Sequence, residues 1–365
     1  MADRYRHRIV EDFTHAFIRD GSSTYIRNLQ TEVGVQRWGD HLLPITINHG
    51  EKAATFVCSP WVGYVDYTRE ELSRFPNRAL VPALHAVVSG VAGILRLADL
   101  DRIVHINNWM MSTNLLAAID AGLVAEQTEE FTARFPCHIL AMRSLNWRQN
   151  SRLMVALQAA GWVLLPSRQL FLVDDIASQM TRRRDLKRDE ALWRNTPYRY
   201  EELQTISRPD AQRIAALYAM LYLDKYSRLN PIYTPDFVIM THAIGMIRYM
   251  VLRDADGVIQ SFGGIHHFAD YATMPLMGYN TGIDQREGLY RLGFHAGSRF
   301  AADNNLAFNM SSGASSFKLA RGATAEMEFS AFHVRHLPAK RRVPIDLLQV
   351  VARRIGMPIL QRYKL

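Results

Sequence analysis

Apolar and polar positions alternate in a regular way through the second half of the chain. Residues 274–279 and 306–308 have the apolar content of buried strands. Between them, residues 289–300 repeat apolar positions at the spacing of one helix face. A loop of small residues follows, where Ser312 is a candidate N-cap for a short helix that ends at Gly322. The pattern predicts strand, helix, strand, loop and short helix.

The first half repeats part of this order. Residues 138–144 predict a strand, 147–160 a helix, and 162–173 two short strands. The halves therefore resemble a diverged duplication. We expect an α/β (α+β) chain of two tandem domains, residues 1–180 and 181–365, each with a mixed central sheet flanked by helices.

Two further segments are assigned from their charge and hydropathy. Residues 176–194 alternate in sign, which predicts a solvated helix that carries Asp189 and Glu190 at the domain boundary. Residues 79–98 are strongly apolar, but a proline, a histidine and an arginine interrupt them. This segment is therefore expected to be a buried helix and not a membrane span.

Composition places the chain among ordinary globular proteins. It has 365 residues, of which 48% are hydrophobic and 21% charged, so two domains with proper cores are expected. Cys58 and Cys137 lie far apart and match no zinc or disulfide spacing. The charged N-terminus lacks an apolar signal region. These features favour a cytoplasmic protein without a bound metal.

The formal net charge of +8 is concentrated at one end of the sequence. Residues 335–365 hold eight Lys and Arg against one Asp, and a second basic run covers 182–188. Such clusters attract polyanions, so they fit a tRNA acceptor stem or the phosphates of coenzyme A. The simpler interpretation is a solvated helix face.

Two short motifs carry the chemical argument. Gln285-x-x-Gly288 stands at the turn into the predicted helix, and Phe317-Lys318-x-x-Arg321-Gly322 follows about one helix and one strand later. Together they resemble the acyl-donor half of the GNAT acyltransferase superfamily. The second motif is closest to the Fem-like branch, two-domain transferases that move an amino acid from aminoacyl-tRNA to an amine. The resemblance covers roughly residues 190–340.

The sequence departs from the usual GNAT pattern at two places. The phosphate loop normally has Gly or Ala where this chain has Tyr290, and many GNAT enzymes use a tyrosine to protonate the coenzyme A sulfur where this chain has Lys318. A thiolate leaves readily because its conjugate acid has a pKa of about 8.5, whereas a ribose oxygen is a far stronger base. The resemblance therefore implies that Lys318 lies at an aminoacyl ester, with Phe317 beside it.

Candidate site residues follow from the motifs and from their places at strand ends. Catalysis is assigned to Lys318, with Glu326 and Glu328 as proton acceptors on one face of the next strand. The expected donor-binding residues are Gln285, Arg286, Gly288, Arg291, Asn309, Ser311, Ser312, Phe317 and Arg321. The expected acceptor-binding residues are Tyr279, Asn280, Asn107 and Asn108. Each polar residue could equally satisfy backbone groups in a turn.

The favoured function is transfer of an aminoacyl group from aminoacyl-tRNA to a nitrogen nucleophile of a small metabolite or peptide, with no tightly bound cofactor. An acyl-CoA-dependent N-acyltransferase is the nearest alternative, and a degenerate, non-enzymatic binding module is the third. Lys318 favours the tRNA donor, a glycine-complete phosphate loop would favour coenzyme A, and loss of both would favour the module. If this assignment is right, the strands at 274–279 and 306–308 should be adjacent and should diverge at their C-terminal ends.

Overall fold

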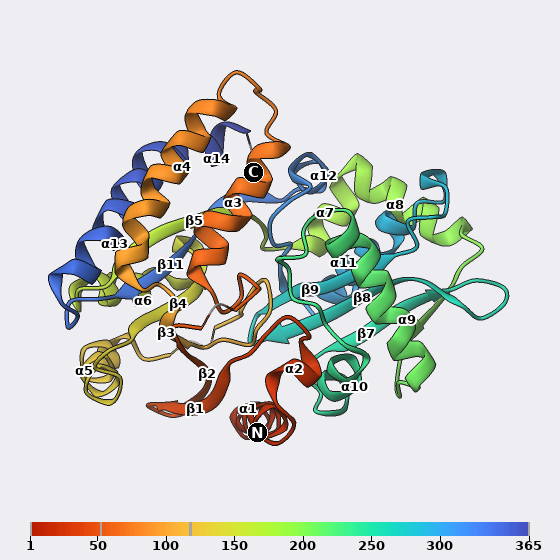
Figure 1. Ribbon diagram of the computed structural model, residues 1–365. Coiled ribbons are helices and arrows are strands. Elements are labelled where there is room, and N and C mark those ends of the chain that lie inside the picture. The colour runs from red at the N-terminus through yellow and green to blue at the C-terminus, as the bar shows by residue number, and fades with distance from the viewer. Residues whose placement is uncertain (1, 52, 117–118, 364–365) are drawn as a thin grey trace. The chain divides into compact units, whose positions relative to one another are not determined.

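The computed structural model describes residues 2–51, 53–116 and 119–363 and forms two compact units (Figure 1). The residues of unit 1 are Met1–Ser22, Asn28–Gln169 and Glu326–Leu365, and those of unit 2 are Ser23–Arg27 and Leu170–Ala325. The predicted mixed α/β class is confirmed. The division differs from the expected boundary at residue 180, because residues 326–365 and their basic tail belong to unit 1. Local patterns did not reveal this long-range return of the chain.

Unit 1 is built on a mixed sheet. Its strands are β1 (Glu32–Trp38), β2 (His41–His49), β3 (Arg102–Ile106) and β4 (Ile139–Leu145), together with most of β11 (Thr324–His333) and the first part of β5 (Val163–Val173). The pairs β1–β2 and β2–β3 are antiparallel, β3–β4 is parallel, and β11 pairs antiparallel with β4. The helices of this unit are α1 (Ala2–Asp20), α3 (Tyr67–Ser73), α4 (Val81–Leu95), α5 (Val124–Arg134), α6 (Trp147–Ala159), α13 (Ala339–Val351) and α14 (Met357–Tyr363).

Unit 2 has a second mixed sheet. β6 (Arg199–Glu202), β7 (Arg248–Arg253), β8 (Ile259–Phe268) and β9 (Tyr271–Tyr279) pair antiparallel in that order. β10 (Ala307–Asn309) is parallel to β9 and antiparallel to the end of β5. The helices are α7 (Ile176–Arg182), α8 (Arg184–Asn195), α9 (Arg208–Tyr218), α10 (Pro235–Ala243), α11 (Leu289–Asp303) and α12 (Ser315–Ala320), and the short α2 (Ser22–Tyr25) begins in unit 1.

In both units a run of antiparallel strands is followed by a parallel strand reached through a helix. In unit 1 this parallel pair is β3 and β4, joined through α5, and in unit 2 it is β9 and β10, joined through α11. The sequence pattern matched residues 138–173 to 274–309 instead. β4, α6 and β5 do follow the expected order of strand, helix and strand along the chain. In the sheet, however, β11 lies between β4 and β5, so these two strands are not neighbours as β9 and β10 are. Hydrophobic periodicity orders elements along the chain but does not choose strand partners.

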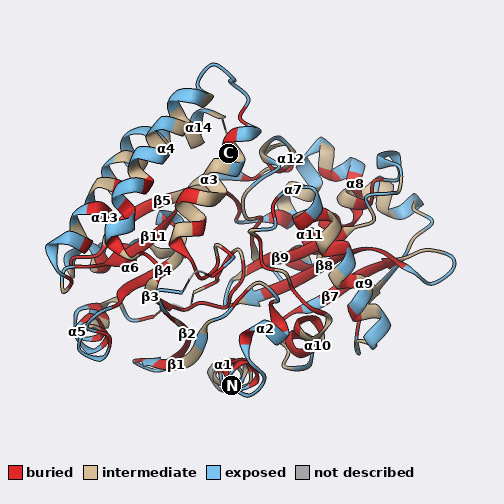
Figure 2. Ribbon diagram, in the orientation of Figure 1, coloured by how far each residue is buried: buried red, intermediate tan, exposed pale blue. Residues whose placement is uncertain are grey.

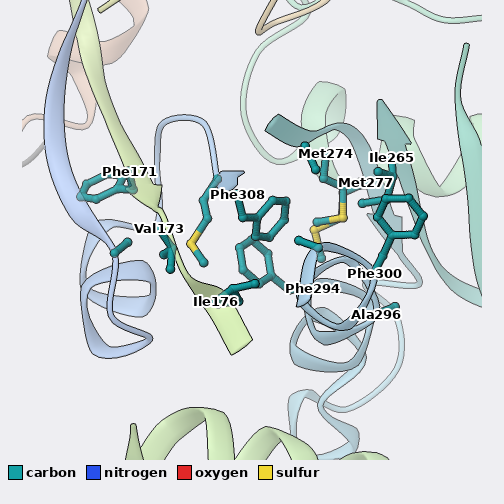
Figure 3. Close-up of a cluster of buried hydrophobic side chains, with 14 of the residues drawn as sticks. Phe171, Val173, Ile176, Ile265, Met274, Met277, Phe294, Ala296, Phe300 and Phe308 are labelled. Atoms are coloured by element: carbon teal, nitrogen blue, oxygen red, sulfur yellow. The ribbon is translucent and has the colours of Figure 1, made fainter. Parts of the chain in front are cut away.

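The core of unit 2 holds α11 and α9 on opposite faces of its sheet. Met277 belongs to the buried cluster that contains Phe294 of α11 (Figure 3). The next residue, Gly278, points to the other face, where an added Cβ would lie 2.5 Å from the backbone carbonyl of Leu217 in α9. Glycine is therefore required at Gly278 for α9 to approach β9 this closely.

The apolar helix expected to be buried is largely exposed. α4 and the following turn cover residues 81–98, of which 17% are buried. Ala92, Leu95 and Ala98 face the core of unit 1, whereas Leu97 is 62% exposed. Figure 2 shows most of α4 in the colours of exposed and intermediate residues. The prediction was wrong because an apolar residue pattern on all sides is typical of burial but does not guarantee a covering element.

Candidate functional site

Within unit 2, β9 continues to Tyr279 beyond its pairing with β10, and we call the region between this part of β9 and the end of β10 the wedge. The two strands pair only between residues 271–273 and 307–309. On its other edge β10 pairs with β5, and this bonding continues past Asn309: the amide of Met310 donates to the carbonyl of Phe171 at 2.9 Å, and the amide of Phe171 donates to the carbonyl of Ser311 at 3.2 Å. The expectation that the two strands are adjacent is confirmed, whereas their divergence at the C-terminal ends stays a prediction.

Aromatic side chains fill the base of the wedge. The rings of Phe294 and Phe308 lie 5.8 Å apart at their centroids and face each other in the buried cluster (Figure 3). Phe294 also contacts the ring of Phe317 at 5.1 Å. Because these contacts join α11, β10 and α12, the apolar core fixes the elements that carry both sequence motifs.

The first motif forms the turn into α11. Gly288 is the residue before this helix and has a φ of 72°, in the left-handed region that favours glycine. Gln285 and Arg286 lie in the preceding short turn and are exposed, with Arg286 paired to Asp284 at 2.6 Å. The free amides of the first turn of a 15-residue helix attract anions, which suits the predicted contact with donor phosphate.

A buried carboxylate connects the two motifs. Asp189 of α8 is 1% exposed and accepts hydrogen bonds from Arg321 at 2.6 and 3.0 Å and from Nε of Arg291 at 2.7 Å. The assignment of Asp189 to a solvated helix face was therefore wrong. Its two partners follow it by more than a hundred residues, so the local charge pattern gave no sign of them.

Glu190, the next residue, holds the middle of α11. It accepts a hydrogen bond from His295 at 2.9 Å and pairs with Arg299 at 3.2 Å. Burial lowers the pKa of His295, whereas the Glu190 carboxylate acts in the opposite direction. These contacts place α8 against α11 and give both acidic residues a structural role.

Phe317 lies under a guanidinium group. The centre of the Arg321 guanidinium is 3.4 Å from the ring centroid, and Arg321 also donates to the Phe317 carbonyl at 2.9 Å. The ring of Tyr290 packs at 5.0 Å on Phe317 and at 5.9 Å on Tyr279. Burial raises the pKa of Tyr290, so its phenol stays protonated at neutral pH. Tyr290, which stands where the GNAT phosphate loop normally has Gly or Ala, thus packs between the two motifs.

The loop between β10 and α12 has an unusual backbone. Ser311, Gly313 and Ala314 have φ values of 58°, 76° and 47°. The Asn309 side chain accepts a hydrogen bond from the Ser311 amide at 2.9 Å and so supports the first of these. Ser312 is not the N-cap that we expected, because the helix begins after Ala314. Left-handed conformations at residues other than glycine cost about 1–3 kcal/mol each and are enriched at functional sites.

Lys318 holds this loop from within. Its side chain is buried, with 3% exposure, and Nζ donates to the carbonyls of Ser311 at 3.2 Å and Ser312 at 2.6 Å. The ammonium also lies 5.6 Å from the centroid of the Phe171 ring. Lys318 is therefore not a surface lysine. Its contacts are those of a positioning residue for the 311–314 loop, and its positive charge lies directly behind that loop.

The two carboxylates predicted as proton acceptors belong to unit 1. Glu328 is 3% exposed and binds Arg168 through both oxygens, at 2.9 and 3.0 Å. Glu326 is half-buried two residues earlier on β11. A carboxylate held in a buried ion pair is a poor base, because protonation would leave the arginine uncompensated. The structure thus favours a structural role for Glu328.

The three asparagines among the predicted acceptor residues satisfy backbone groups. In unit 1, the buried Asn107 donates to the Leu115 carbonyl at 3.2 Å, and Asn108 donates to the Val57 carbonyl at 3.0 Å. In unit 2, Asn280 donates to the Gln260 side chain at 2.9 Å and accepts from the Gly282 amide. Tyr279 alone among the four lies next to the motif residues, through Tyr290.

Metal chemistry has no support from side-chain clusters. Within residues 2–51, 53–116 and 119–363, no group of three or more His, Cys, Asp or Glu is placed to hold a metal ion.

Comparison with known proteins gives only distant similarities. No family model and no curated protein matches the chain. A solved C-terminal domain described as a lysylphosphatidylglycerol synthetase from Agrobacterium fabrum is 15% identical, covers 68% of this chain and 81% of its own, and gives a TM-score of 0.47. L-PGS from Bacillus licheniformis is 14% identical, covers 69% of this chain and 83% of its own, and gives a TM-score of 0.48. FemX is 8% identical, covers 58% of this chain and 78% of its own, and gives a TM-score of 0.45. Similarity at this level leaves substrate and reaction open.

Proposed function

We propose that the chain is an acyltransferase whose unit 2 binds the donor in the wedge between β9 and β10, and that the donor is an aminoacyl-tRNA. The single observation that carries the proposal is the buried ammonium of Lys318 behind the strained 311–314 loop. A fixed cation stabilises the charge that develops when a strongly basic ribose oxygen leaves. A thiolate leaving group needs this help much less.

The remaining parts of the wedge fit an extended anionic donor. Arg291 uses Nε to bind Asp189 while its side chain stays 38% exposed. The start of α11 adds backbone amides, and Gln285 and Arg286 are exposed beside them. The acceptor is proposed to be a nitrogen nucleophile, which must be neutral when it attacks the ester carbonyl.

Acyl-CoA is the second candidate donor. It is favoured by the left-handed Gly288 at the start of a long helix, since such a turn can also hold a pyrophosphate. The two donors differ in their dependence on Lys318: ester cleavage should require the ammonium, and thioester cleavage should depend mainly on the α11 turn.

A donor-consumption assay tests the proposal. The purified full chain is incubated with bulk charged tRNA or with a panel of acyl-CoA thioesters, each with a mixture of small amines and short peptides, and loss of each donor is measured. Lys318→Met should lower the rate of aminoacyl-ester loss about 100-fold, comparable to removal of one oxyanion donor. Lys318→Arg retains the charge and should recover part of this rate.

The matched control is Lys225→Met, which removes an exposed lysine of unit 2 that belongs to neither motif and to neither basic cluster. It should leave the rate unchanged, and circular dichroism should show that all three variants are folded. Loss of thioester with no loss of aminoacyl ester would replace the tRNA donor by acyl-CoA. Equal rates for Lys318→Met and the wild-type protein would remove the support for an ester donor.

A further inference from the structure

One helix in the described part of the chain is long and apolar enough to cross a membrane. It comprises α4 and the turn that follows, Val81–Ala98, with a mean hydropathy of 1.6 and only 17% of its residues buried. Ile94 is 40% exposed and Leu97 is 62% exposed. A soluble protein normally buries a helix of this kind, so its exposure in unit 1 needs an explanation.

A second helical segment packs antiparallel to α4. It comprises α13, a wide turn at Ala352–Gly356, and α14. At one end, Arg341 donates to the carbonyl of Ala98 at 2.8 Å. At the other end, the ring of Tyr363 contacts that of Phe75, just before α4, at 4.7 Å. The two segments lie side by side in Figure 1, and contacts at both ends fix them as one surface.

Both segments expose large aliphatic side chains. Half of the twelve large hydrophobic residues exposed in the described part of the chain lie in these segments or directly before α4: Leu80, Ile94, Leu97, Val343, Val350 and Ile355. Figure 2 shows exposed and intermediate residues along most of α4. We call these residues and the exposed cations of the same segments the α4–α13 face.

The charge of this face is predominantly positive. Within residues 81–98 and 339–363, the exposed or half-exposed cations are Arg96, Lys340, Arg342, Arg353, Arg354 and Arg362. Asp346 is the single carboxylate in the sequence of both segments. Residues 81–95 of α4 contain no Asp, Glu, Lys or Arg. Aliphatic side chains thus occur together with a one-sided positive charge.

We propose that the α4–α13 face binds the surface of a bilayer that contains anionic lipids, with both helices parallel to the membrane plane. Aliphatic side chains enter the boundary between headgroups and acyl chains, and arginines reach the lipid phosphates. α4 does not cross the bilayer, because Ala92, Leu95 and Ala98 on its inner side are committed to the core of unit 1. This inference does not depend on the reaction proposed for unit 2.

Two other occupants fit the face less well. A second copy of the chain would bring the same cations against each other across a twofold contact, with one Asp to offset them. RNA would use the arginines, but single-stranded RNA is bound by aromatic platforms, whereas the exposed apolar residues of this face are aliphatic. A bilayer surface matches both the aliphatic and the cationic components.

Vesicle flotation with the full chain tests the proposal. Vesicles of phosphatidylcholine with phosphatidylglycerol should carry the protein, and vesicles of phosphatidylcholine alone should carry much less. An Ile94→Gln/Leu97→Gln variant should bind the anionic vesicles at least about tenfold more weakly. An Arg353→Gln/Arg354→Gln variant should bind about 30-fold more weakly and lose its dependence on salt in part.

The matched control is Arg152→Gln/Val155→Gln, which removes an exposed arginine and an exposed valine from α6 of the same unit. It should bind like the wild-type protein. The proposal is overturned if the wild-type protein ignores anionic vesicles, or if the control loses as much binding as the α4–α13 variants. If the wild-type protein is a dimer and Leu97→Gln dissociates it, the face binds a second copy of the chain. If deacylated tRNA displaces the vesicles at low salt, and Ile94→Gln/Leu97→Gln binds this tRNA as tightly as the wild-type protein, the face binds RNA.

Discussion

Asp189 and Arg321 form a buried ion pair, with Oδ2 of the carboxylate 2.6 Å from Nε of the guanidinium and both side chains less than 10% exposed. Asp189→Asn removes the charge that compensates Arg321 and also weakens the bond to Arg291. We expect a loss of about 3–5 kcal/mol in the free energy of unfolding, because an unpaired buried guanidinium remains. Urea unfolding measures this loss.

The control for this prediction lies on the same helix. Asp185 pairs with Arg188 at 3.4 Å, but both side chains are solvent-accessible. Asp185→Asn should change stability by less than about 1 kcal/mol. Equal effects of the two substitutions would mean that burial of Asp189 contributes nothing to its ion pair.

Glu328→Gln tests whether this carboxylate is a base or a structural partner. Because Glu328 binds Arg168 through both oxygens inside unit 1, the substitution should destabilise the protein by about 3–5 kcal/mol. Adding Arg168→Met should restore much of the loss, since no charge is then left buried. Thermal unfolding of the single and double variants measures the coupling, and a single variant that lost activity but kept full stability would support the base role instead.

Gly278→Ala should be among the most disruptive small substitutions in unit 2. The new Cβ would lie 2.5 Å from backbone atoms of Leu217, which cannot rotate away as a side chain can. We expect a loss of about 1–3 kcal/mol or more from overpacking. Gly90→Ala on exposed α4 meets no atom within 4 Å and should instead stabilise the protein by about 0.5–1 kcal/mol.

His105 should make the protein less stable in acid. Burial, and secondarily the charge of Arg143, lowers the pKa of His105 to about 3, against about 6.5 in the unfolded chain. Below pH ~6.5, His105 binds a proton in the unfolded state but stays neutral in the folded state. The free energy of unfolding therefore falls by up to about 1.36 kcal/mol per pH unit until the pH approaches about 3. His105→Gln should therefore reduce the slope of the free energy of unfolding against pH by up to the equivalent of one proton. Urea unfolding between about pH 7 and pH 5 measures this slope.

The sequence was sufficient to predict elements whose packing follows their own periodicity. The strand at 274–279, the helix at 289–300 and the left-handed Gly322 are all present, and the glycine has a φ of 90°. The same reasoning predicted that β9 and β10 are adjacent, because strands joined by a helical crossover are usually neighbours in the sheet.

Features that depend on distant parts of the chain were not predicted. Asp189 looks like one charge in an alternating series, and only its partners at 291 and 321 make it a buried residue. Lys318 was recognised from its motif, but its contacts with the carbonyls of Ser311 and Ser312 depend on loop geometry that no spacing encodes. The α4 helix shows the opposite error, because hydropathy does not say whether another element will cover a face.

Unit 1 is built from segments that lie far apart in the sequence, and this affects how the chain folds during synthesis. Its sheet includes β11, whose Phe332 pairs with Ala141 of β4, so the ribosome must add nearly two hundred residues after β4 before this strand exists. Until then, one edge of β4 has no partner in the native sheet, and an unpaired strand edge is open to aggregation. Folding of the first-made half is thus delayed until the second half has been translated, and we expect chaperone dependence to exceed that of proteins whose domains are contiguous in sequence.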